Sequence, residues 1–316
     1  MPAIECEDLV KVFGGRKPVR ALDKLTLSVE EGEVFGLLGP NGSGKTTFVK
    51  CCLNIIFPTS GKLRVLGRHP GHPLTARETG YLPESPSFYE HLSGVGFLLY
   101  HAELARIPSR ERRRRVEEVL EMVKLDELSS RRRLRTYSKG MLQRIGLAQA
   151  LIAKPRIVFL DEPQTGLDPI GRAQVKSTMR EAARQGTTVL FSSHVLADVE
   201  DVADRVAIVD RGKVRRIARL EELTLRTNHV LVRLRPPRSS TISDSGAVPE
   251  SVRRAVDDVG AGAVTYVDGL LSCTVSDEEL IPRLVYELCK WGNEIFEVTR
   301  ERMTLEQTFL KEFSAG

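Results

Sequence analysis

Residues 39–46 read Gly39-Pro-Asn-Gly-Ser-Gly-Lys45-Thr46, which fits the pattern G-x-x-x-x-G-K-[ST] of a phosphate-binding P-loop. The mostly apolar run 33–38 before this loop predicts a short buried strand, and residues 46–56 predict a helix after it. Glycines in the loop can adopt positive φ angles, so successive N–H groups can turn toward one anion, and the helix directs its positive end to the same point. This context favours a nucleotide phosphate site over a glycine-rich turn without a function.

The side chains of the P-loop have separate expected roles. Lys45 is expected to reach the β and γ phosphates and to act in catalysis, and the Thr46 hydroxyl is expected to bind Mg²⁺. The residues expected to hold the nucleotide are Gly39, Asn41, Gly42, Ser43, Gly44, Lys45, Thr46 and Thr47. A P-loop alone indicates only that phosphate is bound, so the reaction has to be inferred from residues further along the chain.

A second informative segment is the apolar run 157–160, which ends in the adjacent carboxylates Asp161 and Glu162. Such a run is typical of a central parallel strand that is buried on both faces, and ligands bind at the carboxyl ends of these strands. Asp161 is therefore expected to hold Mg²⁺, and Glu162 to orient or deprotonate a water molecule in line with the γ-phosphate. The alternative is a strand that ends in a solvated turn, and the P-loop upstream makes it the weaker one.

A third segment, Ser138-Lys-Gly-Met-Leu-Gln143, begins a helical pattern. Ser138 suits the N-cap position, and the free N–H groups after it form a further anion site. The segment resembles the signature loop of the ATP-binding cassette (ABC) ATPases, which normally reads Ser-Gly-Gly-Gln. Ser138 and Gly140 match that loop, whereas Lys139 and Met141 differ from it.

The resemblance covers about residues 4–220 and implies further roles. ATP and Mg²⁺ would be the cofactors, and Ser138 and Gly140 would contact the ATP held by a second copy. Phe13 resembles the aromatic residue that stacks on adenine, Asp168 the D-loop residue at the dimer interface, and His194 the catalytic switch histidine at the γ-phosphate. Each residue also has a structural interpretation, as a core aromatic, a turn residue or a strand-end histidine, but the order of the motifs favours the functional one.

Two positions differ from the family pattern. Glu84 stands where the family commonly has a glutamine that senses the metal and the permease; a glutamate there can still be a ligand on the metal side. Gln164 stands where the family usually has threonine, and the sequence offers no physical account of that change.

Composition limits the class of protein. The 316 residues are 41% hydrophobic and 28% charged, as in a folded chain with one large and one small domain. No apolar run approaches the ~18 residues that a membrane span needs, and the first residues lack the pattern of a secretory signal. We therefore expect the protein to stay in the cytosol. The resemblance to ABC ATPases further implies a peripheral position on the cytoplasmic face of the cell membrane, in contact with the membrane through a permease. The net charge of +5 comes largely from arginines in 110–115 and 131–135. A solvated face, a surface for anionic lipid or an acidic partner, and a nucleic-acid surface are the alternatives, in that order.

The expected fold class is α/β: a P-loop ABC ATPase core with an antiparallel β subdomain and a helical subdomain, plus a small α+β domain. The boundaries are 1–222 for the nucleotide-binding domain, with the helical subdomain at about 85–150, and 223–316 for the accessory domain. In the latter the element order βαββαβ predicts a ferredoxin-like module. A last helix, 304–313, resembles the C-terminal segment of ABC-2 type exporter ATPases.

Three functions are compatible with these motifs. In the first, the chain is the ATP-hydrolysing subunit of an ABC transporter, and most simply of an exporter. It would pair with itself or a related cassette and drive separate transmembrane permease subunits by ATP-dependent dimerisation. In the second, it is a soluble ABC ATPase that acts on ribosomes or nucleic acid; nucleic acid is the less favoured partner, since such relatives usually carry two cassettes or long coiled coils. A third, a nucleotide-binding module without hydrolysis, is disfavoured by Glu162.

Overall fold

The computed structural model describes residues 2–15, 17–223, 226–237 and 248–302, and the chain divides into two compact units on either side of the Leu220–Glu221 bond. Each unit has its own sheets and core, and each is described here by itself. Among the described residues, every helix is too short or too polar to cross a bilayer. The predicted C-terminal helix 304–313 lies outside the described residues.

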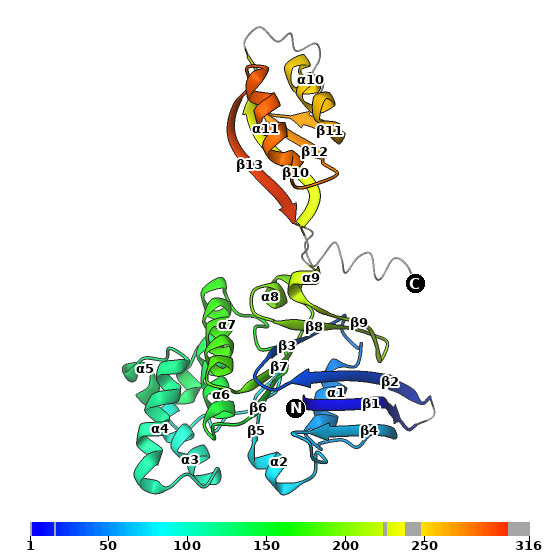
Figure 1. Ribbon diagram of the computed structural model, residues 1–316. Helices are drawn as coiled ribbons and strands as arrows, with labels where there is room; N and C mark the ends of the chain where they lie inside the picture. Colours follow the sequence, from blue (N-terminus) through cyan, green and yellow to red (C-terminus); the bar gives the residue numbers. More distant parts are fainter. Residues whose placement is uncertain (1, 16, 224–225, 238–247, 303–316) are drawn as a thin grey trace. The chain divides into compact units, whose positions relative to one another are not determined.

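A six-stranded sheet forms the centre of the first unit, with the strand order β5-β6-β7-β3-β8-β9 (Figure 1). All neighbours are parallel except β8 and β9, which form an antiparallel pair. Its strands are β3 (Val34–Leu38), β5 (Thr79–Leu82), β6 (Ile157–Leu160), β7 (Thr188–Ser193), β8 (Arg205–Asp210) and β9 (Lys213–Arg219). Every residue of β3, β6 and β7 is buried, as expected for parallel strands covered on both faces.

A three-stranded antiparallel sheet, β2-β1-β4, shares a core with this central sheet. Its strands are β1 (Pro2–Phe13), β2 (Val19–Glu30) and β4 (Ser60–Val65). Helix α1 (Lys45–Cys52) contributes Phe48, Val49, Cys51 and Cys52 to the same core, so the P-loop helix is packed against both sheets. The helix ends before the predicted residue 56, because Asn54 adopts a left-handed conformation (φ 57°) that stops the helical hydrogen-bond pattern.

Helices make up the rest of the first unit, and Figure 1 shows α3, α4 and α5 grouped on one side of it. The helices are α2 (Pro73–Arg77), α3 (Gly94–Leu104), α4 (Ser109–Met122), α5 (Glu127–Arg131), α6 (Lys139–Leu151), α7 (Pro169–Arg184) and α8 (Leu196–Glu200), with a 3₁₀ turn at Leu134–Thr136. The short helix α9 (Leu220–Leu223) begins at the last residue of the first unit. Helices α3 and α4 lie within the part of the chain, about 85–150, for which the sequence predicts a helical subdomain. In α4 the apolar residues Val116, Val119 and Leu120 are buried.

One charged residue of α4 is buried as well. The Arg115 guanidinium donates to the carbonyl oxygens of Leu151 (2.6 Å) and Ile152 (2.8 Å) and pairs with Glu118 (3.0 Å). These carbonyls belong to the C-terminal end of α6, where helical partners are lacking and a positive charge is favoured. Arg115 therefore joins α4 to the helix that carries the predicted signature loop.

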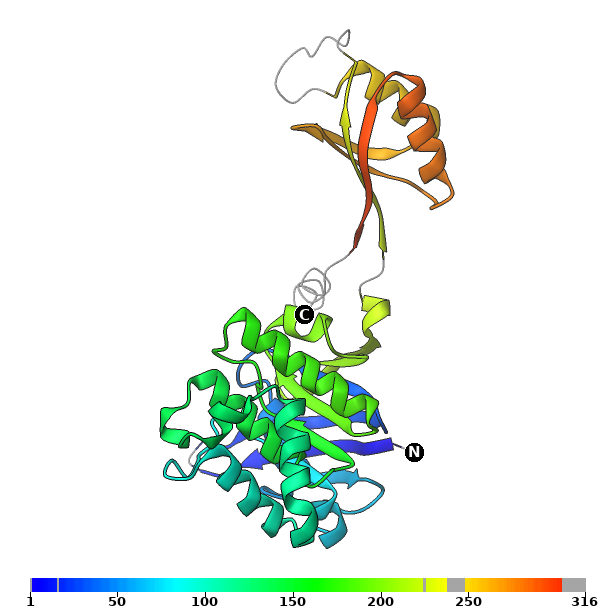
Figure 2. The same ribbon diagram turned by 90° about the vertical axis from the view of Figure 1, so that its left-hand side faces the viewer.

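The second unit has the element order β10-α10-β11-β12-α11-β13. The elements are β10 (Arg226–Arg235), α10 (Glu250–Val259), β11 (Gly262–Val267), β12 (Leu270–Thr274), α11 (Leu280–Lys290) and β13 (Glu294–Arg302). The strands form one antiparallel sheet in the order β11-β12-β10-β13, and Figure 2 shows both helices on the same face of it. Its core is a separate cluster that includes Val232, Val256, Leu271 and Leu284.

Candidate active site

The P-loop runs from the end of β3 to the start of α1 and is closely enclosed. A Cβ atom on Gly39 would lie 2.1 Å from the Val209 carbonyl oxygen, so only glycine fits there. Gly42 (φ 78°) and Gly44 (φ 109°) adopt left-handed conformations that other residues rarely take. The loop thus has the backbone shape with which consecutive N–H groups can surround an anion.

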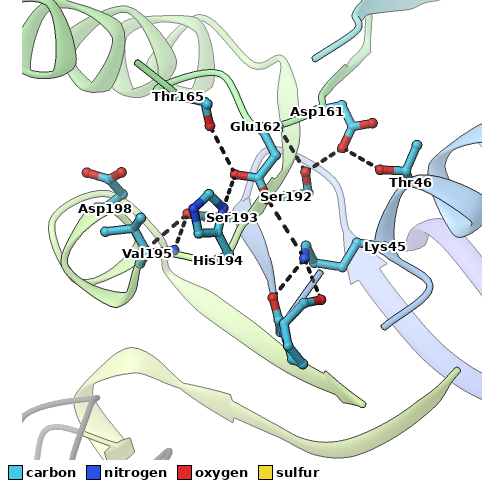
Figure 3. Close-up of polar contacts among 12 residues, drawn as sticks. Lys45, Thr46, Asp161, Glu162, Thr165, Ser192, Ser193, His194, Val195 and Asp198 are labelled. Carbon is cyan, nitrogen blue, oxygen red and sulfur yellow. Dashed lines mark hydrogen bonds and ion pairs between the residues drawn. The ribbon is translucent and has the colours of Figure 1, made fainter. Parts of the chain in front are cut away.

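Lys45 lies across this loop (Figure 3). Its Nζ donates to the carbonyl oxygens of Gly39 (2.7 Å) and Pro40 (3.2 Å) and lies 3.8 Å from Glu162 Oε1. The side chain is only 6% exposed, and this burial lowers the pKa of Lys45, whereas the charges of Glu162, Asp161 and Glu84 act in the opposite direction. The ammonium group is therefore partly dehydrated, so it would bind the phosphates of a nucleotide strongly.

Asp161 follows β6 and lies at the carboxyl end of the parallel sheet. Its Oδ1 accepts hydrogen bonds from Thr46 (3.0 Å) and from Ser192 (2.6 Å), which joins the P-loop helix to β6 and β7 (Figure 3). The carboxylate is 1% exposed, and no Lys or Arg among the described residues forms an ion pair with it. A buried carboxylate whose side-chain hydrogen-bond partners are hydroxyl groups can bind a cation, and Mg²⁺ prefers oxygen ligands of this kind. Thr46 and Asp161 therefore fit a magnesium ion.

Glu162 is held by several partners. His194 Nδ1 lies 2.8 Å from its Oε2, Thr165 Oγ1 donates to the same oxygen (3.3 Å), and its backbone N–H donates to Ser192 Oγ (2.9 Å). Glu162 has a backbone φ of 49°, which is a strained conformation for any residue other than glycine. In this conformation its carboxylate faces Lys45 (Figure 3). A fixed carboxylate beside a cation can orient a water molecule and accept its proton.

Comparison with known proteins agrees with this geometry. Residues 22–165 match the family described as ABC transporter. The daunorubicin resistance ATP-binding protein DrrA3 of Streptomyces coeruleorubidus is 34% identical over 98% of this chain and 95% of its own length. The chain belongs to the ABC transporter ATP-binding proteins. An uncharacterised ABC transporter ATP-binding protein of Synechocystis is 46% identical over 64% of this chain. The match spans only 57% of that relative's length.

A solved structure shows the same ABC fold. The dimeric post-hydrolysis state of the ATP-binding cassette MJ0796, bound to ADP and Pi, covers 69% of this chain and 98% of its own, with a TM-score of 0.63 and 24% identity. The family and the α/β cassette fold that the sequence predicts are thereby confirmed.

The predicted signature and D-loop residues of this ABC protein lie at helix starts. Ser138 Oγ accepts from Met141 N (3.3 Å) at the start of α6, and Asp168 Oδ1 accepts from Gly171 N (2.7 Å) at the start of α7. A Cβ on Gly166 would lie 2.0 Å from Lys139 Nζ, so the lysine side chain crosses the D-loop at its glycine. Within the described part of the chain, no hydrogen bond or ion pair joins Ser138, Gly140 or Asp168 to the P-loop.

The other predicted residues lie around the loop with fewer contacts. Phe13 is 40% exposed, with the Lys11 ammonium 5.0 Å from its ring centre. Glu84 is exposed and acts on Lys45 through its charge, and Asn41 is exposed, whereas Thr47 is half-buried. Ser43 is buried, and its hydroxyl has no hydrogen-bond partner among the described residues.

Sequence reasoning missed two residues of the site. Ser192 bonds both Asp161 and the Glu162 backbone, and Thr165 bonds the Glu162 carboxylate. Ser192 is the second-last residue of β7, two residues before the predicted switch histidine His194, so a hydroxyl at the end of a buried strand was the available signal. Gln164 is 4% exposed, and neither of its amide atoms has a partner in the described residues.

Proposed function

We propose that this protein is the ATP-hydrolysing subunit of an ABC exporter. The observation that carries the proposal is the convergence of Lys45, Asp161, Glu162 and His194 at the carboxyl ends of β3, β6 and β7. Thr46 and Asp161 would hold Mg²⁺, with Glu84 on the metal's side of the site. The bound ion would neutralise negative charge on the phosphates. Lys45 binds the transferred phosphoryl group, Glu162 accepts the proton of the attacking water, and His194 keeps Glu162 in place.

The chain would act as a dimer, with itself or with a related cassette. It contains one P-loop and one signature loop, and Ser138 and Gly140 have no polar contact with its own P-loop in the described residues. A head-to-tail partner would bring these residues, and Asp168, to the γ-phosphate of the opposite nucleotide. Loss of that phosphate removes contacts to both subunits, so hydrolysis separates the dimer.

A groove in the first unit supports a separate permease as the partner at the membrane. Its volume is about 890 Å³, and it lies between β5, the segment after it, α3 and α6. Aromatic side chains line it, among them Tyr81, Phe88, Tyr89 and Phe97. A short cytoplasmic helix of a permease fits such a groove. Export is supported by the similarity to a protein named for drug resistance along almost its whole length.

Purification of the tagged protein from membranes of its own cells tests this function. We expect a membrane protein with several spans to copurify, and we expect ATP hydrolysis that Glu162→Gln abolishes while ATP binding is kept. Copurification of ribosomes or nucleic acid instead would favour the alternative, an ABC ATPase that acts off the membrane. Equal and negligible hydrolysis by wild type and Glu162→Gln in the copurified complex would overturn the assignment as an ATPase.

A further inference from the structure

The two arginine-rich segments differ in how their charges are satisfied. In α4 four of the five arginines pair with a glutamate: Arg110 with Glu111, Arg112 with Glu103, and both Arg114 and Arg115 with Glu118. Arg113 alone is exposed without an ion pair in the described residues. After α5 the situation changes. Arg131 pairs with Glu127, but Arg132, Arg133 and Arg135 are exposed and form no ion pair with a carboxylate within the described ranges. We name these three residues the arginine rim.

The backbone of the arginine rim is fixed. Three backbone hydrogen bonds tie it to the segment 90–94. The N–H of Leu134 donates to the Leu92 carbonyl (2.9 Å), and that of Arg135 to the Glu90 carbonyl (3.1 Å). The Arg132 carbonyl accepts from the N–H of Gly94 (3.3 Å). Leu134 is 1% exposed and anchors the segment in the core of the helical region. The Arg132 guanidinium donates to the Thr136 carbonyl oxygen (3.1 Å), and all three arginines are exposed. They belong to a segment that is already ordered, so a ligand would not have to order the backbone.

An apolar side chain lies beside these charges in the sequence. Leu128 of α5 is 82% exposed, the most exposed large apolar side chain among the described residues. Residues 126–136 contain no aromatic side chain on which a nucleic-acid base could stack. Exposed leucine together with unpaired arginine is the combination that adsorbs to the headgroup layer of an anionic bilayer. The planar guanidinium also matches the oxygens of a lipid phosphate.

The arginine rim also borders the proposed permease groove. Glu90, whose carbonyl accepts from Arg135 N, follows directly after the groove residue Tyr89. A permease helix in that groove would bring this side of the protein toward the bilayer surface. We infer that Arg132, Arg133 and Arg135, with Leu128, form a contact surface for anionic phospholipid headgroups. The inference rests on the proposed function only in placing the protein at a membrane.

Cosedimentation with vesicles tests the inference on the purified full-length protein. The vesicles contain phosphatidylcholine alone or phosphatidylcholine with one third phosphatidylglycerol, at low and at high salt. We expect binding to the anionic vesicles only, weakened by salt. The variant Arg132→Gln/Arg133→Gln/Arg135→Gln should lower the partition constant on the order of a hundredfold, at about tenfold for each 1.4 kcal/mol.

A matched control is Arg110→Gln/Arg113→Gln/Arg114→Gln, which removes the same charge from α4. Its partition constant should fall far less, and Leu128→Ser should weaken binding without a change of charge. Equal losses in both triple variants would assign binding to net charge and overturn the inference. Failure to bind anionic vesicles would also overturn it, and binding of a DNA oligonucleotide instead, lost in the rim variant, would assign the surface to nucleic acid. ATP hydrolysis and permease copurification, measured on the same variants, report separately on the proposed function.

Discussion

His194 Nδ1 lies 2.8 Å from Glu162 Oε2, and the other carboxylate oxygen of Glu162 faces Lys45 Nζ at 3.8 Å. The two carboxylate oxygens thus have different partners. Oε2 is held by His194, which follows β7, and Oε1 faces Lys45, the residue that binds phosphate. Because Glu162 has a strained backbone, this orientation depends on its partners. His194 is therefore a positioning residue for Glu162 in addition to any contact with the nucleotide.

Replacing His194 tests this relationship. In His194→Ala the carboxylate loses its 2.8 Å partner, so we expect kcat to fall about a hundredfold, within the range that general-base catalysis contributes. The ATP dissociation constant should change little, because Lys45 and the P-loop remain. Thr165→Val, which removes only the 3.3 Å bond to the same oxygen, is the control and should have a smaller effect. Wild-type kcat in His194→Ala would rule out the positioning role.

Ser192 is expected to matter for stability and for magnesium. Ser192→Ala leaves the buried Asp161 carboxylate with one hydroxyl partner fewer and the Glu162 N–H without an acceptor, at a cost of about 1–3 kcal/mol in the free energy of unfolding. Because Asp161 loses the hydrogen bond from Ser192, the Mg²⁺ concentration that gives half-maximal ATP hydrolysis should also change. Denaturant unfolding and a Mg²⁺ titration measure the two effects. Ser193→Ala, whose hydroxyl bonds only Val195, is the control; equal losses in both would contradict the assigned role.

Lys45 gives a pH-dependent stability of definite sign. Burial lowers its pKa below the ordinary value of 10.5, so the unfolded chain binds more protons than the folded one between the lowered pKa and 10.5. The stability contributed by Lys45 therefore rises with pH in that window. We expect the free energy of unfolding of wild type, relative to Lys45→Met, to increase as the pH rises toward 10.5, because the comparison removes the contribution of the other lysines and tyrosines that titrate in this range. A difference that is constant or falls with pH would show that Lys45 is not desolvated.

Arg115 is expected to stabilise the helical region. Arg115→Met removes the donors for the Leu151 and Ile152 carbonyls at the end of α6, and we expect a loss of about 2–3 kcal/mol in unfolding free energy. Arg114→Met is the matched control, since Arg114 is 84% exposed and also pairs with Glu118. Its loss should be much smaller, as for exposed ion pairs in general. Similar losses in the two variants, measured by urea unfolding, would contradict the capping role.

Strong local patterns made much of the fold predictable. The P-loop between an apolar run and a helix, and the apolar run before Asp161, correspond to β3, α1 and β6. The amphipathic period in residues 110–124 corresponds to α4, with Val116, Val119 and Leu120 on its buried side. In each case the pattern is complete within a few residues, so it can be recognised without knowledge of distant partners.

Distant contacts explain what was missed. Strand β5 has four residues, and β9 carries four positive charges among its seven residues, so neither stands out from a loop in the sequence. The order β7-β3-β8 joins strands far apart along the chain, and no local pattern specifies it. The role of Ser192 also depends on such a contact, because its partner Asp161 belongs to a neighbouring strand. Interactions between strands, rather than residue types, determined these features.

The enclosure of Gly39 by Val209, together with that of Gly44 by Ala21, has a consequence for biosynthesis. The P-loop lies early in the chain, whereas Val209, which encloses Gly39, lies in β8. This strand is translated after the helical region and after β6 and β7. A nascent chain that stops before β8 leaves the ribosome with a complete P-loop motif and no rigid anion pocket. ATP would therefore engage only chains whose synthesis has passed that strand, so ligand capture comes late in maturation.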